Sequence, residues 1–180
     1  MSLARLVYRT EQFRKYLGIR AAPLDLSQAQ EILTPAQMAL FLRLQPGEQA
    51  HSLEVLGRLQ AQGEVDPDLQ VAALLHDVGK SRFPLQVWER VWIVLAPKLF
   101  PGRFRTWGAA QGALNKLPWW QRLAAVAAQH PAWGAELAQA AGCSMRAVSL
   151  IRRHQEPALL DSQNEEDQLL ASLQAFDERS

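Results

Sequence analysis

The residues best suited to chemistry are a histidine and an aspartate that stand side by side after an apolar segment. His76 and Asp77 follow five apolar residues, 71–75, and precede Gly79 and Lys80. A carboxylate beside an imidazole is costly to bury unless another charge compensates it. A divalent cation would do so, because imidazole nitrogen and carboxylate oxygen suit Mn, Fe, Ni, Zn or Mg. The sequence therefore predicts a metal site for one or two such ions.

The two residues that follow this pair indicate an anionic ligand. Gly79 lets a ligand approach the backbone closely. Lys80 comes four residues after His76 and three after Asp77, so on a helix it shares their face. We expect Lys80 to bind a phosphate oxygen of the substrate and to assist catalysis. The alternative is an exposed lysine at a helix end.

Three further histidines, His51, His130 and His154, lie in or at the ends of expected helices. Each also has a structural interpretation. His51 could be satisfied by a neighbour on its helix, and His130 could cap a helix that starts at Pro131. His154 follows two arginines, at a position where a positive charge stabilises a helix C-terminus.

The order of these residues resembles the H…HD…D pattern of the HD superfamily of metal-dependent phosphohydrolases. Residues 74–80, LLHDVGK, are similar to the family signature, including the Gly and Lys of the HD-GYP branch. Residues 130–137, 151–156 and 169–177 resemble the later motifs of two-metal members. The resemblance covers roughly residues 48–178.

The resemblance implies a ligand set and a nucleophile. One metal would be bound by His51, His76, Asp77 and Asp177. A second would be bound by His130 and His154, with Asp77 bridging the two ions. A metal-bound hydroxide would attack the phosphorus. Asp161 and Asp167 are rivals of Asp177 in the same acidic stretch.

The chain also departs from the HD-GYP pattern. That branch usually has two adjacent histidines where this chain has His154 and Gln155, and a Gly-Tyr-Pro triplet where residues 156–160 read EPALL. These differences disfavour cyclic di-GMP hydrolysis. A carboxylate for a third metal would fall at Gly47, which has no side chain to offer.

The elements that position these residues are expected to be helices. The sequence has no alternating β-branched run and no Asn-Gly or Asp-Gly hairpin signal. Helical periodicity predicts helices at about 3–17, 27–32, 35–44, 48–62, 67–78, 84–96, 119–129, 131–141, 144–154 and 165–178. We expect an all-α fold: a single HD-domain helical bundle over residues 26–180, preceded by an N-terminal amphipathic helix and linker over residues 1–25.

Composition excludes several classes of protein. The single cysteine, Cys143, rules out an intrachain disulfide and a thiolate zinc cluster. The N-terminus has no apolar core of a signal peptide, and the most apolar stretch, 91–95, is far too short to span a bilayer. We therefore expect a cytoplasmic protein.

Basic residues are concentrated in one part of the chain. Residues 80–122 contain eight Lys or Arg and one acid, and residues 83–107 interleave basic with aromatic side chains. Such a segment could bind nucleic acid or an anionic membrane surface. Helical spacing of its aromatic residues favours a place in the core or a lid over the metal site. We also expect Trp119, Trp120 and Trp133 in the core.

The favoured function is hydrolysis of a small phosphate ester: a nucleotide, a cyclic nucleotide or a related monoester or diester. Nucleic acid is not expected as a partner, a membrane surface is possible but not favoured, and a homodimer is possible. Two alternatives remain open. One is a catalytically weak HD-type module that binds a nucleotide and regulates, and the other is a di-iron oxygenase of HD type.

Overall fold

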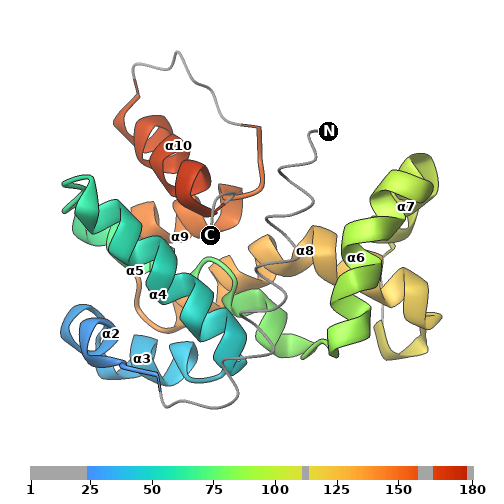
Figure 1. Ribbon diagram of the computed structural model, residues 1–180, viewed down its shortest axis with the longest axis horizontal. Helices are drawn as coiled ribbons and strands as arrows, with labels where there is room; N and C mark the ends of the chain where they lie inside the picture. Colours follow the sequence, from blue (N-terminus) through green and yellow to red (C-terminus); the bar gives the residue numbers. More distant parts are fainter. Residues whose placement is uncertain (1–23, 111–113, 158–163, 178–180) are drawn as a thin grey trace.

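The computed structural model describes residues 24–110, 114–157 and 164–177, and this part of the chain is all-α, as expected. Its helices are α2 (Ser27–Ile32), α3 (Pro35–Phe41), α4 (Pro46–Ala61), α5 (Pro67–Leu75), α6 (Val87–Leu99), α7 (Pro101–Gly108), α8 (Trp119–Ala140), α9 (Met145–Arg153) and α10 (Glu165–Asp177), with short 3₁₀ helices η2 (Val78–Arg82) and η3 (Leu114–Lys116) (Figure 1). The helix expected at 3–17 lies outside the described residues. None of the described helices is long and apolar enough to cross a membrane.

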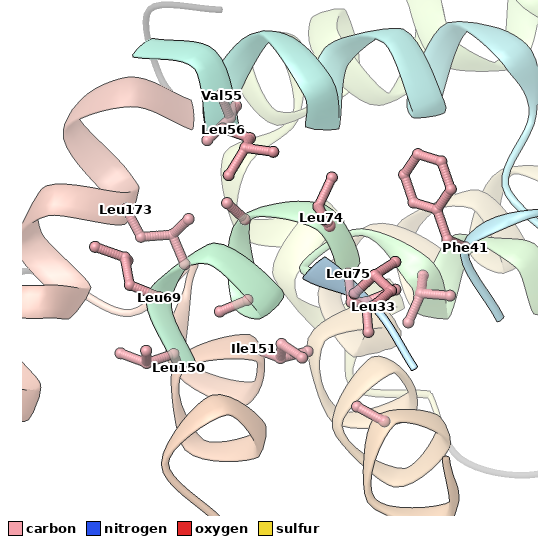
Figure 2. Close-up of a cluster of buried hydrophobic side chains, with 14 of the residues drawn as sticks. Leu33, Phe41, Val55, Leu56, Leu69, Leu74, Leu75, Leu150, Ile151 and Leu173 are labelled. Carbon is pink, nitrogen blue, oxygen red and sulfur yellow. The ribbon is translucent and has the colours of Figure 1, made fainter. Parts of the chain in front are cut away.

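Helix α5 lies at the centre of the bundle. Leu69 and residues 72–75 of this helix are fully buried, and α2, α4, α9 and α10 all pack against it. Figure 2 shows side chains from α4, α5, α9 and α10 meeting around it: Val55, Leu56, Leu69, Leu74, Leu75, Leu150, Ile151 and Leu173. The second half of α5, residues 71–75, is apolar all round and needs such complete cover. The surrounding helices thereby fix the position of its C-terminal end.

Local sequence signals set where these helices begin. The side chain of Thr34 accepts a hydrogen bond from Gln37 N in a capping box at α3. Asp66 accepts from the backbone of Asp68 and Leu69 at α5. Ser144 accepts from Ala147 N at α9. Each cap satisfies backbone donors that a helix start leaves without partners.

Helix α8 is one continuous helix, so the prediction of two helices broken at Pro131 is wrong. Proline lacks the N–H that would bond to the carbonyl of Ala127. The Nδ1 atom of His130 lies 3.0 Å from that carbonyl oxygen and takes over the hydrogen bond. The helix therefore continues to Ala140, and Gly142, with φ of 76°, follows its end.

Other helix bounds also differ from the prediction. Helix α3 ends at Phe41 instead of 44, and α6 spans Val87–Leu99 instead of 84–96. Helix α5 ends at Leu75 instead of 78, and the chain turns into η2 immediately after His76 and Asp77. Helix α7 was not predicted. It begins at Pro101 in the first turn, a position that proline favours.

Helices α6 and α7 extend to one side of the bundle (Figure 1) and pack on α8. Trp92 and Ile93 of α6 join a second, small core around Leu85, Leu123 and Val126. The prediction that Trp119 and Trp120 are core residues is wrong, because they are 40% and 37% exposed. They lie in the first turn of α8, which the other described helices do not bury. Trp133 is partly buried and contacts Phe83.

Candidate metal centre

Six side chains from five helix segments meet around the end of α5. His76 is the C-cap of α5, and Asp77 directly precedes η2. The other four come from α4, α8, the C-cap of α9 and the last residue of α10: His51, His130, His154 and Asp177. His76, Asp77, His130 and His154 are each at most 5% exposed. The structure therefore brings all six predicted ligands together.

The first group of donors consists of His51, His76, Asp77 and Asp177. The Oδ1 atom of Asp177 lies 2.9 Å from His51 Nε2 and 3.4 Å from His76 Nε2. The Oδ2 atom of Asp77 lies 3.7 Å from His76 Nε2. His51, His76 and Asp77 offer donor atoms that all lie within 4.8 Å of one another, close enough to share one metal ion.

The second group consists of Asp77, His130 and His154, whose donor atoms also lie within 4.8 Å of one another. The Oδ1 atom of Asp77 lies 3.2 Å from His130 Nε2 and 3.9 Å from His154 Nε2. Asp77 thus directs one oxygen toward each group. This is the arrangement that a carboxylate needs to bridge two ions.

Backbone carbonyls orient the three buried imidazoles. The Nδ1 atoms of His76, His130 and His154 lie 2.9, 3.0 and 2.8 Å from the carbonyl oxygens of Ala73, Ala127 and Ile151. A carbonyl can only accept, so Nδ1 carries the proton in each ring. In the neutral ring, Nε2 then presents its lone pair to the centre, as metal-binding histidines do.

This donor set fits a divalent cation. The Nε2 atoms of His130 and His154 lie 3.3 Å apart, and two neutral rings in this tautomer would face each other with lone pairs only. The buried Nε2 atom of His76 makes no well-formed hydrogen bond among the described residues, and the carboxylate oxygens of Asp177 and Asp77 lie 3.4 and 3.7 Å from it. Buried polar atoms without such bonds are costly. A cation ligated by these nitrogens and by carboxylate oxygen would satisfy them.

When no metal is bound, protonation of a histidine balances negative charge of the buried carboxylates. Burial would lower the pKa of His76, but the carboxylates of Asp77 and Asp177 raise it to about 9. Burial, together with the neighbouring rings of His76 and His130, lowers the pKa of His154 to about 3. At neutral pH, His76 is therefore charged and His154 neutral. The protonated ring of His76 then supplies the positive charge that a bound metal ion would otherwise supply.

The carboxylates are held ionised. Burial would raise the pKa of Asp77, but Lys80, His76 and His130 keep it well below its ordinary value. Burial would likewise raise the pKa of Asp177, but His76 and His51 lower it. Both groups are therefore negative at neutral pH and ready to ligate metal.

Lys80 is the cationic side chain at this centre. Its Nζ atom lies 2.5 Å from Asp77 Oδ2, and its side chain is 24% exposed. Burial would lower the pKa of Lys80, but Asp77 and Glu48 raise it. The ammonium group stays charged and remains partly open to solvent. In the 3₁₀ helix η2, residues three apart eclipse each other, which aligns Lys80 with Asp77.

No local sequence signal marks the residues that hold these helices in place. Gln174 Nε2 donates to the carbonyl oxygens of Glu156 at 2.6 Å and His154 at 3.0 Å. Arg153 binds Asp167 at 2.6 Å. Both interactions tie α10, which carries Asp177, to the end of α9, which carries His154. They join residues that only the tertiary fold makes neighbours.

Comparison with known proteins gives one match. The sequence model of a family described as the HD domain matches residues 49–177, a span that contains all six side chains of the centre. No curated protein and no solved structure matches the chain.

Proposed function

Since the chain belongs to the HD domain family, whose members are usually metal-dependent hydrolases, we propose that it hydrolyses phosphate esters with one or two divalent ions. One observation carries the proposal: two groups of nitrogen and oxygen donors share Asp77 at a buried centre. His51, His76, Asp77 and Asp177 would hold one ion. His130 and His154, with Asp77, would hold the other.

Bound ions would supply a hydroxide at neutral pH and polarise the phosphoryl group. The chain's own residues prepare the site for this. Asp77 is ionised and directs an oxygen to each donor group. The Nδ1–carbonyl hydrogen bonds fix three imidazoles before any ligand arrives, so little reorganisation is needed.

Lys80 would bind the phosphate of the substrate. It keeps its positive charge at neutral pH and lies beside the metal-bridging carboxylate. A fixed cation next to a phosphoryl group stabilises the negative charge that develops in the transition state. We assign the substrate to small nucleotides, cyclic nucleotides or related monoesters and diesters. Cyclic di-GMP is disfavoured, because the chain lacks the second histidine and the triplet of the HD-GYP pattern.

The test is hydrolysis by the metal-loaded chain of p-nitrophenyl phosphate, bis-p-nitrophenyl phosphate and a panel of nucleotides. Asp77→Asn should abolish turnover, because the amide cannot supply two anionic ligands. Glu31→Gln, an exposed substitution on α2, serves as the control and should leave turnover unchanged.

The two alternatives have distinct outcomes in the same assay. A regulatory module would bind a nucleotide without turnover, and a di-iron oxygenase would need iron and consume O₂. Metal-loaded chain that turns over none of these esters would refute the proposed hydrolase.

A further inference from the structure

The outer side of α6 is an exposed apolar surface. Among the described residues, eleven large hydrophobic side chains are exposed, and eight of these lie on α6, at its end or at the start of α8. We call this set the α6 face: Val87, Trp88, Val91, Leu95, Leu99, Phe100, Trp119 and Trp120. Trp88 is 55% and Leu99 63% exposed. A concentration of this kind marks an interaction surface more than scattered exposure does.

The α6 face is continuous across two helices. Positions 88, 91, 95 and 99 follow one another at intervals of three or four, so they lie along one side of α6. The ring of Trp119 lies 5.3 Å from that of Trp88 and 5.8 Å from that of Trp120. The tryptophans of α8 therefore extend the stripe of α6. The adjoining side of α6, with Trp92 and Ile93, packs on the small core near α8, and the ring of Trp92 lies 5.3 Å from that of Trp119.

The exposed charges near the α6 face are positive. Residues 90–135 contain six Lys or Arg and no acid, and one of the six, Arg90, binds Glu48 at 2.7 Å. Lys98, Arg103 and Arg105 are exposed at the end of α6 and on α7. The one acid of α6, Glu89, is buried and lies 3.4 Å from Arg122. The stripe itself carries only apolar side chains, and the basic residues stand beside it.

We propose that the α6 face binds the surface of an anionic lipid bilayer. Aliphatic and tryptophan side chains enter the boundary between headgroups and acyl chains, and adjacent Lys and Arg bind the anionic headgroups. A nucleic acid would need basic side chains along the contact itself to meet its phosphates. Val87, Val91, Leu95 and Leu99 offer it nothing to pair with.

Charge disfavours two other binding partners for the α6 face: a second copy of the chain and the N-terminal residues of the same chain. A second copy of the chain would bring the same basic residues against themselves in a twofold contact. Residues 1–20 of this chain contain five Lys or Arg and one acid, so they too would meet charges of their own sign. The same basic composition adds to the attraction toward an anionic bilayer.

The experiment is flotation of the full chain with vesicles of phosphatidylcholine, alone or mixed with phosphatidylglycerol. The wild type should bind the anionic vesicles and not the neutral ones. Leu99→Glu should weaken binding about tenfold or more, because it removes an inserted side chain and adds a negative charge. Met145→Glu is the matched control, since Met145 is 71% exposed on α9 and the charge change is identical. It should bind like the wild type.

A second pair of variants leaves the apolar stripe intact. Arg103→Glu should weaken binding to anionic vesicles about fivefold or more, while Arg43→Glu, exposed after α3, should change it far less. Thermal unfolding checks that each variant is folded.

Three results would overturn the proposal. The first is no binding to either vesicle. The second is binding that Leu99→Glu and Arg103→Glu leave unchanged, which would place the contact elsewhere on the chain. The third is a Leu99-dependent dimer in sedimentation, or Leu99-dependent binding of single-stranded DNA, without vesicle binding.

Discussion

Substituting Gly79 by alanine should break the candidate metal centre without touching any of its six side chains. A Cβ atom built on Gly79 lies 2.0 Å from the carbonyl oxygen of His130 and 2.7 Å from Gly134 N. Ordinary contact begins at 3.4 Å, so η2 and α8 must separate by about 1.4 Å. The obstacle is backbone and not the end of a flexible side chain. Overpacking of this kind costs about 1–3 kcal/mol of unfolding free energy.

A separation of η2 and α8 by this distance would affect metal binding. His130 Nε2 lies 3.2 Å from Asp77 Oδ1, and a shift of about 1.4 Å would widen this distance to as much as about 4.6 Å, close to the 4.8 Å that spans the donor group. Gly79→Ala should therefore bind the ion of the second group more weakly and keep its affinity for the first. The control is Gly57→Ala in α4, where no described atom lies within 4 Å of the new Cβ. That change should stabilise the chain by up to about 1 kcal/mol.

Urea unfolding of metal-free protein measures the change in stability, and metal titration of both variants measures the change in metal binding. The reasoning would be refuted if Gly79→Ala were as stable as Gly57→Ala and bound the wild-type number of ions.

Three further predictions follow from the site. In metal-free protein the pKa of His76 is raised from 6.5 to about 9, so its stabilisation is complete below pH 6.5 and is lost as pH rises toward 9. The unfolding temperature should fall across that window, and it should not fall in the metal-loaded protein; a flat profile without metal contradicts the assignment. Lys80→Met should lower turnover of a phosphate ester roughly 100-fold while metal content stays constant, and metal loss instead would make Lys80 a structural residue. Gln174→Met should cost about 1 kcal/mol in urea unfolding, because the carbonyls of His154 and Glu156 lose a donor; unchanged stability would show that water replaces the amide.

The sequence predicts those features of the fold that local signals mark, such as the starts of helices. Proline at the first helical turn and capping side chains such as Thr34 and Asp66 mark the starts of α3 and α5. The continuity of α8 could not be predicted, because the bond that replaces the missing N–H of Pro131 comes from the ring of His130. No local signal marks the close approach of Gly79 to the backbone of His130 and Gly134 either, because these residues lie far apart in the sequence.

In the candidate site, too, some features are predictable from the sequence and others depend on tertiary packing. The resemblance to the HD superfamily selected His51, His76, Asp77, His130, His154 and Asp177, which the structure gathers. Their role as ligands stays a prediction. Exposure of Trp119 and Trp120 was not foreseeable, because helical spacing is the same whether a face meets another helix or solvent.

The central claim is that Asp77 joins two metal sites, and metal content per chain tests it most directly. Protein purified without chelators and loaded with Mn or Fe should bind two ions in the wild type, one in His154→Ala and none retained in Asp77→Ala. Equal metal content in the wild type and Asp77→Ala would contradict the claim, and so would two ions in His154→Ala.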